Sequence, residues 1–378
     1  MNRPFFSIII PTKNRPTLLR DAIKSVVLQN FDDYELIVSD NFNDELTKKV
    51  IDEFKGDSRL RYLRTERELS HPDHWEFAAK GAEGFYILLL TDRSFFRQGA
   101  LRDIHNTVEG LGNPEVVFWK YGYFDEGKGI LEGEKDEAGV KFFDSIDILK
   151  NFNRTYDMHL LPRPHVGCYR RDLIDKIRSD VGALYLPFGP DYTSSFLVLS
   201  RVAKAVFIPR PLFFLQGYSV SQGTKSQSSI AGYLQSLNIK DPYQYVPIKA
   251  SINVSLIFND FFKIQDIAGG NLRNFPFDWT FYFSKCYQEL TEKTPIWNVD
   301  EKIVDALWEE WWRALFSFDK KTQKAVRRQI LIARLHFLRS LLRISPAGNV
   351  LVKIKRFLLG KPTRRFSSAL EAGGFKKD

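Results

Sequence analysis

The chain has 378 residues and a net charge of +9, and its composition of 44% hydrophobic, 14% aromatic and 27% charged residues excludes a disordered protein. Two cysteines, Cys168 and Cys286, are too few for a disulfide framework or a thiolate metal site, which predicts a reducing cytosol. No apolar stretch is long enough to predict a membrane-spanning helix or a signal peptide. The length allows one large domain with an appendage, or two domains.

The first hundred residues predict a regular alternation of strands and helices. Near-continuous apolar runs predict strands at 5–11, 34–40, 60–65 and 85–92. Apolar residues at helical spacing predict helices at 15–29, 44–54 and 71–83. Such alternation with buried strands is typical of a parallel sheet covered on both faces.

The pattern is less regular from about residue 110. Strands are predicted at 114–124 and 205–215, the latter at a sheet edge because Pro209 and Pro211 each lack an N–H donor. Helices are predicted at 142–152 and 191–203, and a strand followed by a helix at 166–177. Residues 217–229 predict a polar linker, and residues 230–318 a mainly helical, aromatic-rich region.

Polar residues follow three of the predicted strands, in the segments 11–15, 39–41 and 91–93. One such segment alone could be a turn or a helix cap, whereas three at one edge of one sheet predict a binding site. The glycine-rich phosphate loops GxGxxG and GxxxxGK[ST] are absent, which argues against a dinucleotide dehydrogenase and a P-loop enzyme.

The stretches FSIIIPTKNRPTLLRDAIKSVVLQNFDDYELIVSDN and AAKGAEGFYILLLTDRSFFRQGAL resemble the N-terminal half of family 2 glycosyltransferases, over roughly residues 5–215. The resemblance implies an α/β, Rossmann-like glycosyltransferase-A fold. Its central sheet would be mostly parallel, and a mainly helical C-terminal region would follow. It also implies an enzyme that inverts the anomeric carbon of a sugar carried by a nucleotide diphosphate.

The resemblance assigns the donor side of the site to the first two strand ends. In the family the first turn contacts the nucleotide, and here this turn supplies Thr12, Asn14 and Arg15. The acid after the second strand binds the base, usually uracil, and that position matches Asp40. The family's usual pair of acids is reduced here, because Ser39 occupies the first position.

The resemblance places the family's aspartate-any-aspartate motif on residues 91–94, where Asp92 is the only acid. The last acid of the motif normally binds Mn²⁺ or Mg²⁺, and its position falls here on Arg93 or Ser94. Neither side chain suits a hard dication, which prefers anionic oxygens. Asp92 is therefore a candidate for binding a donor hydroxyl or a metal, and metal independence is suspected.

Arg93 offers a physical substitute for a metal. A guanidinium is permanently cationic and its donors fit phosphate oxygens. We therefore expect Arg93, with Arg15 or Arg97, to stabilise the charge that develops on the departing nucleoside diphosphate. The alternative is that Arg93 pairs with Asp92 and the site is inactive.

The other expected group is a base. In the family it lies before a helix, after a strand that carries an arginine pair, and GCYRRDLIDKI followed by LPFGPDYTSSF matches this layout with Asp191. The alternative for Asp191 is a helix N-cap. His165, just before the same strand, is a candidate contact for donor phosphate or acceptor, or else a structural residue.

The positive charge is concentrated near the C-terminus. Residues 320–365 contain 14 Lys and Arg and no acid, which leaves the rest of the chain with a net charge of −5. Apolar residues recur every three or four positions within 324–344, which predicts a cationic amphipathic helix on an anionic membrane surface. Packing on the protein body and an oligomer contact are alternatives. Without an aromatic-basic RNA motif, no nucleic-acid partner is expected.

Together these observations predict a catalytic domain at 1–217, a helical aromatic-rich region at 218–319 and a basic amphipathic tail at 320–378. The expected function is transfer of a sugar from a UDP-sugar donor to a hydroxyl of a glycan or lipid-linked acceptor in cell-surface polysaccharide biosynthesis. The expected location is cytoplasmic, at the inner face of the plasma membrane. The alternatives are a non-catalytic sugar-nucleotide or glycan-binding module and a scaffold for an anionic surface.

Overall fold

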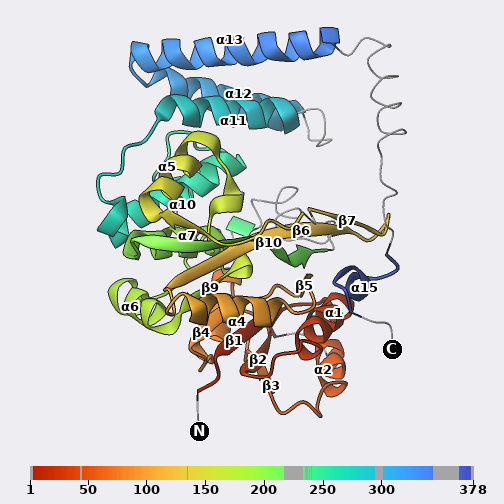
Figure 1. The fold of residues 1–378 in the computed structure, drawn as a ribbon. Helices are drawn as coiled ribbons and strands as arrows, with labels where there is room; N and C mark the ends of the chain where they lie inside the picture. Colours follow the sequence, from red (N-terminus) through yellow and green to blue (C-terminus); the bar gives the residue numbers. More distant parts are fainter. Residues whose placement is uncertain are drawn as a thin grey trace. The chain divides into compact units, whose positions relative to one another are not determined.

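The computed structural model (Figure 1) describes residues 3–42, 45–133, 135–216, 233–234, 237, 239, 241–293, 301–343 and 366–375. Side chains are described at these positions except 301, 303 and 336–343. The predicted linker at 217–229 and the part of the basic tail at 344–365 lie outside the described residues.

The chain divides into two compact units. The first comprises Met1–Lys240, Asp260–Phe275 and Arg365–Asp378, and the second comprises Asp241–Asn259 and Pro276–Arg364. Helix α10 (Asn253–Ala268) contributes residues to both. The predicted domain boundaries at 217 and 319 stay a prediction.

The first unit is built on a ten-stranded sheet whose main path runs β3-β2-β1-β4-β9-β6-β10-β5, with β7 paired to β6 and β8 to β10. Six strands, namely β1, β2, β3, β4, β6 and β10, run in the same direction, which confirms the predicted mostly parallel sheet. The strands are β1 (Phe6–Thr12), β2 (Tyr34–Asp40), β3 (Leu60–Arg64), β4 (Tyr86–Leu89), β5 (Ser94–Phe96), β6 (Val116–Asp125), β7 (Ile130–Glu132), β8 (Lys141–Asp144), β9 (Gly167–Arg170) and β10 (Lys204–Leu215).

Two helical layers cover the sheet, with α4 on one side and α5 on the other (Figure 1). Alternate residues of β1, such as Ile8 and Ile10, join the core that includes α1, α2 and α4, whereas Ile9 is buried outside that core. Both faces of β1 are therefore buried, as its continuous apolar run predicts. The helices of this unit are α1 (Pro16–Val27), α2 (Glu45–Asp52), α3 (His71–Lys80), α4 (Ala100–Gly110), α5 (Ser145–Thr155), α6 (Arg171–Val181) and α7 (Pro190–Arg201).

The prediction of an edge strand at 205–215 is wrong. Strand β10 pairs with β6 along one side, and with β8 and then β5 along the other. Pro209 and Pro211 fall between the segments that pair with β8 and β5, where the register against β6 also shifts. The missing donors are therefore tolerated inside the sheet because they lie at an irregularity.

A short C-terminal segment belongs to the first unit. Phe366, together with Ala369 and Ala372 of α15 (Ala369–Ala372), shares an apolar cluster with Phe95 of β5 and with neighbouring strands. The N–H of Phe366 donates to the carbonyl of Gly129 (2.7 Å), which fixes the entry of this segment. Residues more than 200 positions after β5 in the sequence thus support the strand that follows Asp92.

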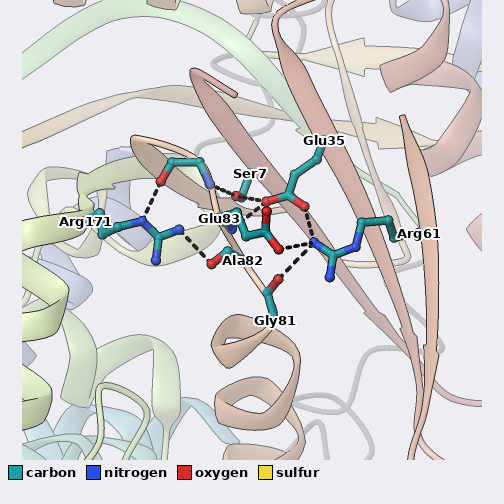
Figure 2. Close-up of polar contacts among 8 residues, drawn as sticks. Ser7, Glu35, Arg61, Gly81, Ala82, Glu83 and Arg171 are labelled. Atoms are coloured by element: carbon teal, nitrogen blue, oxygen red, sulfur yellow. Dashed lines mark hydrogen bonds and ion pairs between the residues drawn. The ribbon is translucent and has the colours of Figure 1, made fainter. Parts of the chain in front are cut away.

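A buried polar network lies at the amino-terminal ends of the strands (Figure 2). The Glu35 carboxylate accepts hydrogen bonds from Ser7 Oγ (2.6 Å), from the main-chain N–H of Glu83 (2.5 Å) and from Arg61 Nη1 (2.5 Å). Glu35 is 7% exposed, so a charge-assisted network takes the place of water around it.

The same network holds the turn that leads from α3 into β4. Arg171 donates to the carbonyls of Ala82 (2.7 Å) and Gly84 (2.8 Å), and the Gly84 N–H donates to Ser7 Oγ (2.6 Å). A Cβ atom at Gly84 would lie 2.6 Å from the main-chain carbonyl carbon of Phe6. Only glycine allows this close approach of the turn to β1.

The second unit is mainly helical in its described part, as predicted for the region beyond residue 230. It contains α11 (Trp279–Lys293), α12 (Glu301–Phe316) and α13 (Lys320–Arg343). Trp311 is fully buried and donates from Nε1 to the carbonyl of Phe283 (3.1 Å). Helix α13 confirms the predicted helix as far as Arg343, and no helix among the described residues meets the length and apolarity needed to cross a bilayer.

Candidate functional site

Three strand ends meet at the carboxyl edge of the sheet. Parallel pairing places Thr12 beside Asp40, and pairing of β1 with β4 brings the residues after β4 to the same edge. Thr12 Oγ1 donates to Asp92 Oδ2 (3.0 Å), and Arg15 Nη1 donates to Asp92 Oδ1 (2.8 Å). The structure therefore brings Thr12, Arg15 and Asp92 together, in agreement with the sequence.

Asp40 is fully buried at the end of β2. Its Oδ2 accepts a hydrogen bond from the hydroxyl of Tyr62 on β3 (2.9 Å), and burial together with the Asp40 carboxylate raises the pKa of Tyr62. The preceding Ser39 Oγ lies 3.0 Å from His74 Nε2, and burial lowers the pKa of His74 to about 3. The histidine beside this strand end is thus neutral at physiological pH.

Asn14 lies in the turn between β1 and α1. It is exposed and has a φ of 59°, in the left-handed region that asparagine tolerates better than most residues. Arg15 is the N-cap residue of α1 and Pro16 is its first helical residue. The turn therefore presents an exposed amide next to the Arg15–Asp92 ion pair, without a glycine.

Arg93 is not the ion-pair partner of Asp92, although the two charges attract each other. The Asp92 carboxylate forms its ion pair with Arg15, while Arg93 Nη1 donates to the carbonyl of Gln216 (3.3 Å). Burial lowers the pKa of Arg93, with a further contribution from the nearby charge of Arg15. Arg97, the other candidate cation, forms an ion pair with Asp136 on the surface (2.8 Å).

Asp191 lies in the first turn of α7 but does not cap it. The N-cap residue is Gly189, and Pro190 begins the helix, so the N-cap alternative for Asp191 is wrong. Burial raises the pKa of the Asp191 carboxyl, while the charge of Arg163 and the main-chain N–H groups of Asp191 and Tyr192 oppose this shift. A partly buried carboxylate with a raised pKa is a stronger proton acceptor than an ordinary surface carboxylate.

His165 is buried next to these groups. Its Nδ1 has no hydrogen-bond partner among the residues that the structure describes. Burial lowers the pKa of His165 well below its usual value, and the charges of Arg163 and Arg93 act in the same direction. His165 is thus an uncharged imidazole close to two cations, and its role in binding phosphate or acceptor stays a prediction.

Two residues of this region were not identified from the sequence. Arg163 Nη1 lies 3.8 Å from Asp191 Oδ2, and Asp260 on α10 accepts from the N–H groups of Phe188 (3.0 Å) and Gly189 (3.0 Å). Burial raises the pKa of Asp260 to about 7. The position of Arg163 between two prolines, in LPRPHVG, is a signal that could have indicated it. No local pattern indicates Asp260.

The residues after β4 do not form a site suited to a hard dication. Asp92 is the only acid there, and both of its oxygens already accept hydrogen bonds. Arg93 and Ser94 occupy the positions where a second carboxylate would be needed. In the described part of the chain, no cluster of three His, Cys, Asp or Glu side chains could hold a metal.

Comparisons with a family model and with curated proteins match this chain to glycosyltransferases. Residues 7–177 match the model of glycosyl transferase family 2. A GalNAc(5)-diNAcBac-PP-undecaprenol beta-1,3-glucosyltransferase from Campylobacter jejuni is 36% identical over 100 residues, which cover 26% of this chain and 32% of that protein. Glycosyltransferase GlyA from Streptococcus pneumoniae is 20% identical over 227 residues, or 58% of this chain and 31% of that protein.

The chain thus spans about a third of the length of these curated relatives. Among solved structures, Staphylococcus aureus TarS 1–349 in complex with UDP-GlcNAc matches with a TM-score of 0.48 and 15% identity, covering 84% of this chain and 74% of that one. A score of this size assigns neither fold nor ligand. Asp191 and Asp260 lie beyond the matched residues 7–177, so their importance rests on geometry.

Proposed function

This chain belongs to glycosyl transferase family 2 through residues 7–177, and we propose on that premise that it is an inverting glycosyltransferase. It transfers a sugar from a nucleotide diphosphate, most simply UDP, to a hydroxyl of a glycan or lipid-linked acceptor. The Campylobacter jejuni relative is named for an acceptor linked to undecaprenol through a diphosphate, which supports a lipid-linked acceptor in cell-surface biosynthesis.

One observation carries the proposal: Thr12, Arg15, Asp40 and Asp92 converge at the carboxyl ends of the parallel strands, within the residues that match the family. Open α/β sheets bind their ligands at this edge. Asp40 and the turn containing Asn14 would bind the base and ribose. Asp92, fixed by Thr12 and Arg15, would accept from a ribose or sugar hydroxyl.

Asp191 is the proposed base. The acceptor oxygen attacks the anomeric carbon, its proton passes to the Asp191 carboxylate, and the bond between that carbon and the diphosphate oxygen breaks with its electron pair on the diphosphate. Attack from the face opposite the leaving group inverts the anomeric carbon. The raised pKa of Asp191 supports this role, because a carboxylate with a raised pKa is a stronger base.

Arg93 is the proposed cation for the leaving diphosphate. Its guanidinium is partly buried, and the charges of Arg15 and Arg163 act on it, so the site gathers positive charge without carboxylate ligands for a metal. A desolvated guanidinium stabilises developing phosphate charge strongly. Mn²⁺ or Mg²⁺ held by Asp92 would be the alternative source of positive charge.

The basic tail is proposed to bind an anionic membrane surface, which would hold the protein at the inner face of the plasma membrane. Within its described part, α13 carries only basic charged residues, and Leu331, Ile332 and Leu335 are exposed on it. Exposed apolar side chains among cations are typical of helices that lie in a membrane interface. No nucleic-acid partner is proposed.

A second candidate is a non-catalytic sugar-nucleotide or glycan-binding module. The observation that favours it is the replacement of the acidic motif by Arg93 and Ser94. Such a module would bind the nucleotide at the same sheet edge and leave the glycosidic bond intact.

Binding and turnover separate the two candidates. We expect UDP, but not GDP, CDP or dTDP, to raise the melting temperature equally with Mn²⁺ and with EDTA, and Asp40→Asn to remove the effect. At 100 times its Kd, a ligand stabilises the fold by about 2.7 kcal/mol. The control is Asp147→Asn, because Asp147 is an exposed acid on α5.

Release of UDP from a panel of UDP-sugars, including UDP-GlcNAc, tests catalysis. We expect Asp191→Asn to lower the rate by roughly 10²–10⁴-fold. We expect Arg93→Met to lower the rate in EDTA, while Arg97→Met, which alters only the surface pair with Asp136, leaves it unchanged. Binding of UDP without release would favour the binding module, and loss of activity in EDTA would contradict the role of Arg93.

A further inference from the structure

We propose that Arg163 is a positioning residue that fixes the Asp191 carboxylate and favours its ionised form, an inference that rests on the proposed role of Asp191 as the base. Arg163 comes from the segment before β9, and Asp191 from the first turn of α7. The two side chains therefore meet only in the folded chain.

Arg163 is held rigidly. Its side chain is 9% exposed, and Nη2 donates to the hydroxyl of Tyr121 (2.8 Å). Its guanidinium carbon lies 5.3 Å from the ring centroid of Tyr121 and 5.8 Å from that of Tyr192. Two aromatic rings and a hydrogen bond thus fix the direction of the guanidinium. A flexible surface arginine would have no such fixed direction.

The distance to Asp191 suits a positioning role. Arg163 Nη1 lies 3.8 Å from Asp191 Oδ2, which is too long for a hydrogen bond but short enough for a strong electrostatic attraction. A carboxylate that accepted two guanidinium hydrogen bonds would have its lone pairs occupied. At 3.8 Å Arg163 does not itself occupy the lone pairs of Asp191, whose side chain is still 21% exposed.

The same cation limits the effect of burial on the base. Burial raises the pKa of Asp191, and the charge of Arg163 is the largest opposing influence, followed by main-chain N–H groups and Arg93. Removal of Arg163 should therefore raise this pKa further and move the ionised form to higher pH. The other titratable groups that interact with Asp191 are Asp260, Tyr169, Tyr192 and Tyr233.

The geometry leaves Arg163 with capacity for a further contact. Its Nε is buried and has no hydrogen-bond partner among the described residues. Arg163 contacts Tyr121, Tyr192 and a distant carboxylate, but its unpaired Nε leaves it incompletely paired for a buried cation among the described residues. This is the pattern expected of a group that serves a neighbouring carboxylate and not only the packing of the fold.

The first test needs no substrate. The Asp191→Asn substitution mimics the protonated acid. The difference in free energy of unfolding between Asp191→Asn and the same protein with Asp191, here called the stability gap, therefore reports the pKa of Asp191. The folded-state pKa of Asp191 is raised. Below the unfolded pKa of about 3.9, the protein with Asp191 and the Asp191→Asn variant therefore have equal stability. As pH rises above that value, the protein with Asp191 becomes the less stable of the two. We expect this gap to widen and to level off at higher pH in the Arg163→Met background.

The second test is the pH profile of kcat/KM for UDP release from UDP-GlcNAc. We expect Arg163→Met to move the acid limb to higher pH and to lower kcat/KM most strongly at pH values below that limb. Arg163→Lys should keep most of the wild-type rate and most of the wild-type position of the acid limb. Tyr121→Phe, which removes the hydrogen bond to Arg163 together with the hydroxyl contact to Tyr123, should move the limb less.

Arg178→Met is the matched control. Arg178 is also a partly buried arginine, and its Nε donates to Glu76 (2.7 Å). It should lower the melting temperature without changing the stability gap or the acid limb. If Arg163→Met does not fold, Arg163→Lys and Tyr121→Phe carry the test.

An unchanged gap and an unchanged acid limb in the folded Arg163 and Tyr121 variants would overturn the inference. Failure of the proposed function looks different: Asp191→Asn would then release UDP as fast as the wild type. In that case the stability gap would still report whether Arg163 favours the ionised form of Asp191.

Discussion

Two polar clusters lie at opposite ends of the same strands, and they differ in how completely their atoms are paired. At the amino-terminal ends, the Glu35 network satisfies a carboxylate, a hydroxyl and the N–H groups of a turn with short hydrogen bonds (Figure 2). At the carboxyl ends, Asp191 lies 3.8 Å from its nearest cation, and the ring of His165 keeps an unpaired Nδ1 among the described residues.

This difference distinguishes a structural network from a reactive site. Full pairing stabilises one geometry and leaves no group with a lone pair or proton to exchange. Incomplete pairing of buried groups costs stability, and proteins tolerate it where the groups bind or transform a ligand. The incomplete pairing of Asp191 and His165 supports the proposal that the carboxyl edge carries the function, although both clusters contain acids and arginines.

The largest expected effect concerns the closed network. Gly84→Ala would place a Cβ 2.6 Å from the main-chain carbonyl carbon of Phe6, so β1 or the turn must move. We expect a loss of about 3 kcal/mol in the free energy of unfolding, measured by urea denaturation, with nucleotide affinity of the folded protein unchanged. The control is Gly56→Ala, since a Cβ at Gly56 meets no atom within 4 Å.

A matched pair of substitutions on β1 compares the two edges directly. Ser7→Ala removes a donor to Glu35 and an acceptor for the Gly84 N–H, and we expect it to cost about 2 kcal/mol of stability without affecting activity. Thr12→Val removes one donor to Asp92, and we expect it to cost about 1 kcal/mol and to raise KM for the donor. Equal effects of both changes on KM would contradict the division into structural and functional edges.

The smallest expected effect is a gain of stability at the site. Burial raises the pKa of Asp191, so the folded state favours the protonated acid. As pH rises and the acid ionises, the free energy of unfolding of the wild type therefore falls. We expect Asp191→Asn to melt at a higher temperature than the wild type at pH 8 and at the same temperature near pH 3.5. Calorimetry of both proteins across this range is the measurement, and a lower melting temperature for Asp191→Asn at pH 8 would contradict the prediction.

Much of the fold is readable from short segments. The strands β1 to β4 and the helices α1 to α3 match their predicted positions, because burial on both faces or on one helical face leaves a local pattern of apolar residues. The convergence of Thr12, Arg15 and Asp92 follows from parallel strands whose ends share an edge. These features need only the order of the elements.

Other features depend on which distant segments meet. Strand β10 was expected at an edge because of its prolines, but its neighbours β5, β6 and β8 come from segments far from it in the sequence. Asp260 holds the main chain just before Asp191 from a helix about 70 residues later. No local pattern reports such pairs.

The sequence by itself determined the class of fold, the match of residues 7–177 to glycosyl transferase family 2 and the strand ends that are proposed to bind a donor, since periodicity and strand-end chemistry are local properties. Only the tertiary structure decided that Arg15, and not Arg93, pairs with Asp92, and that Arg163 faces Asp191. A pKa and an ion pair depend on burial and on distances between residues remote in the chain. They exist only after the chain has folded, and for that reason the sequence predicted a role for Asp191 but not its ion pair with Arg163.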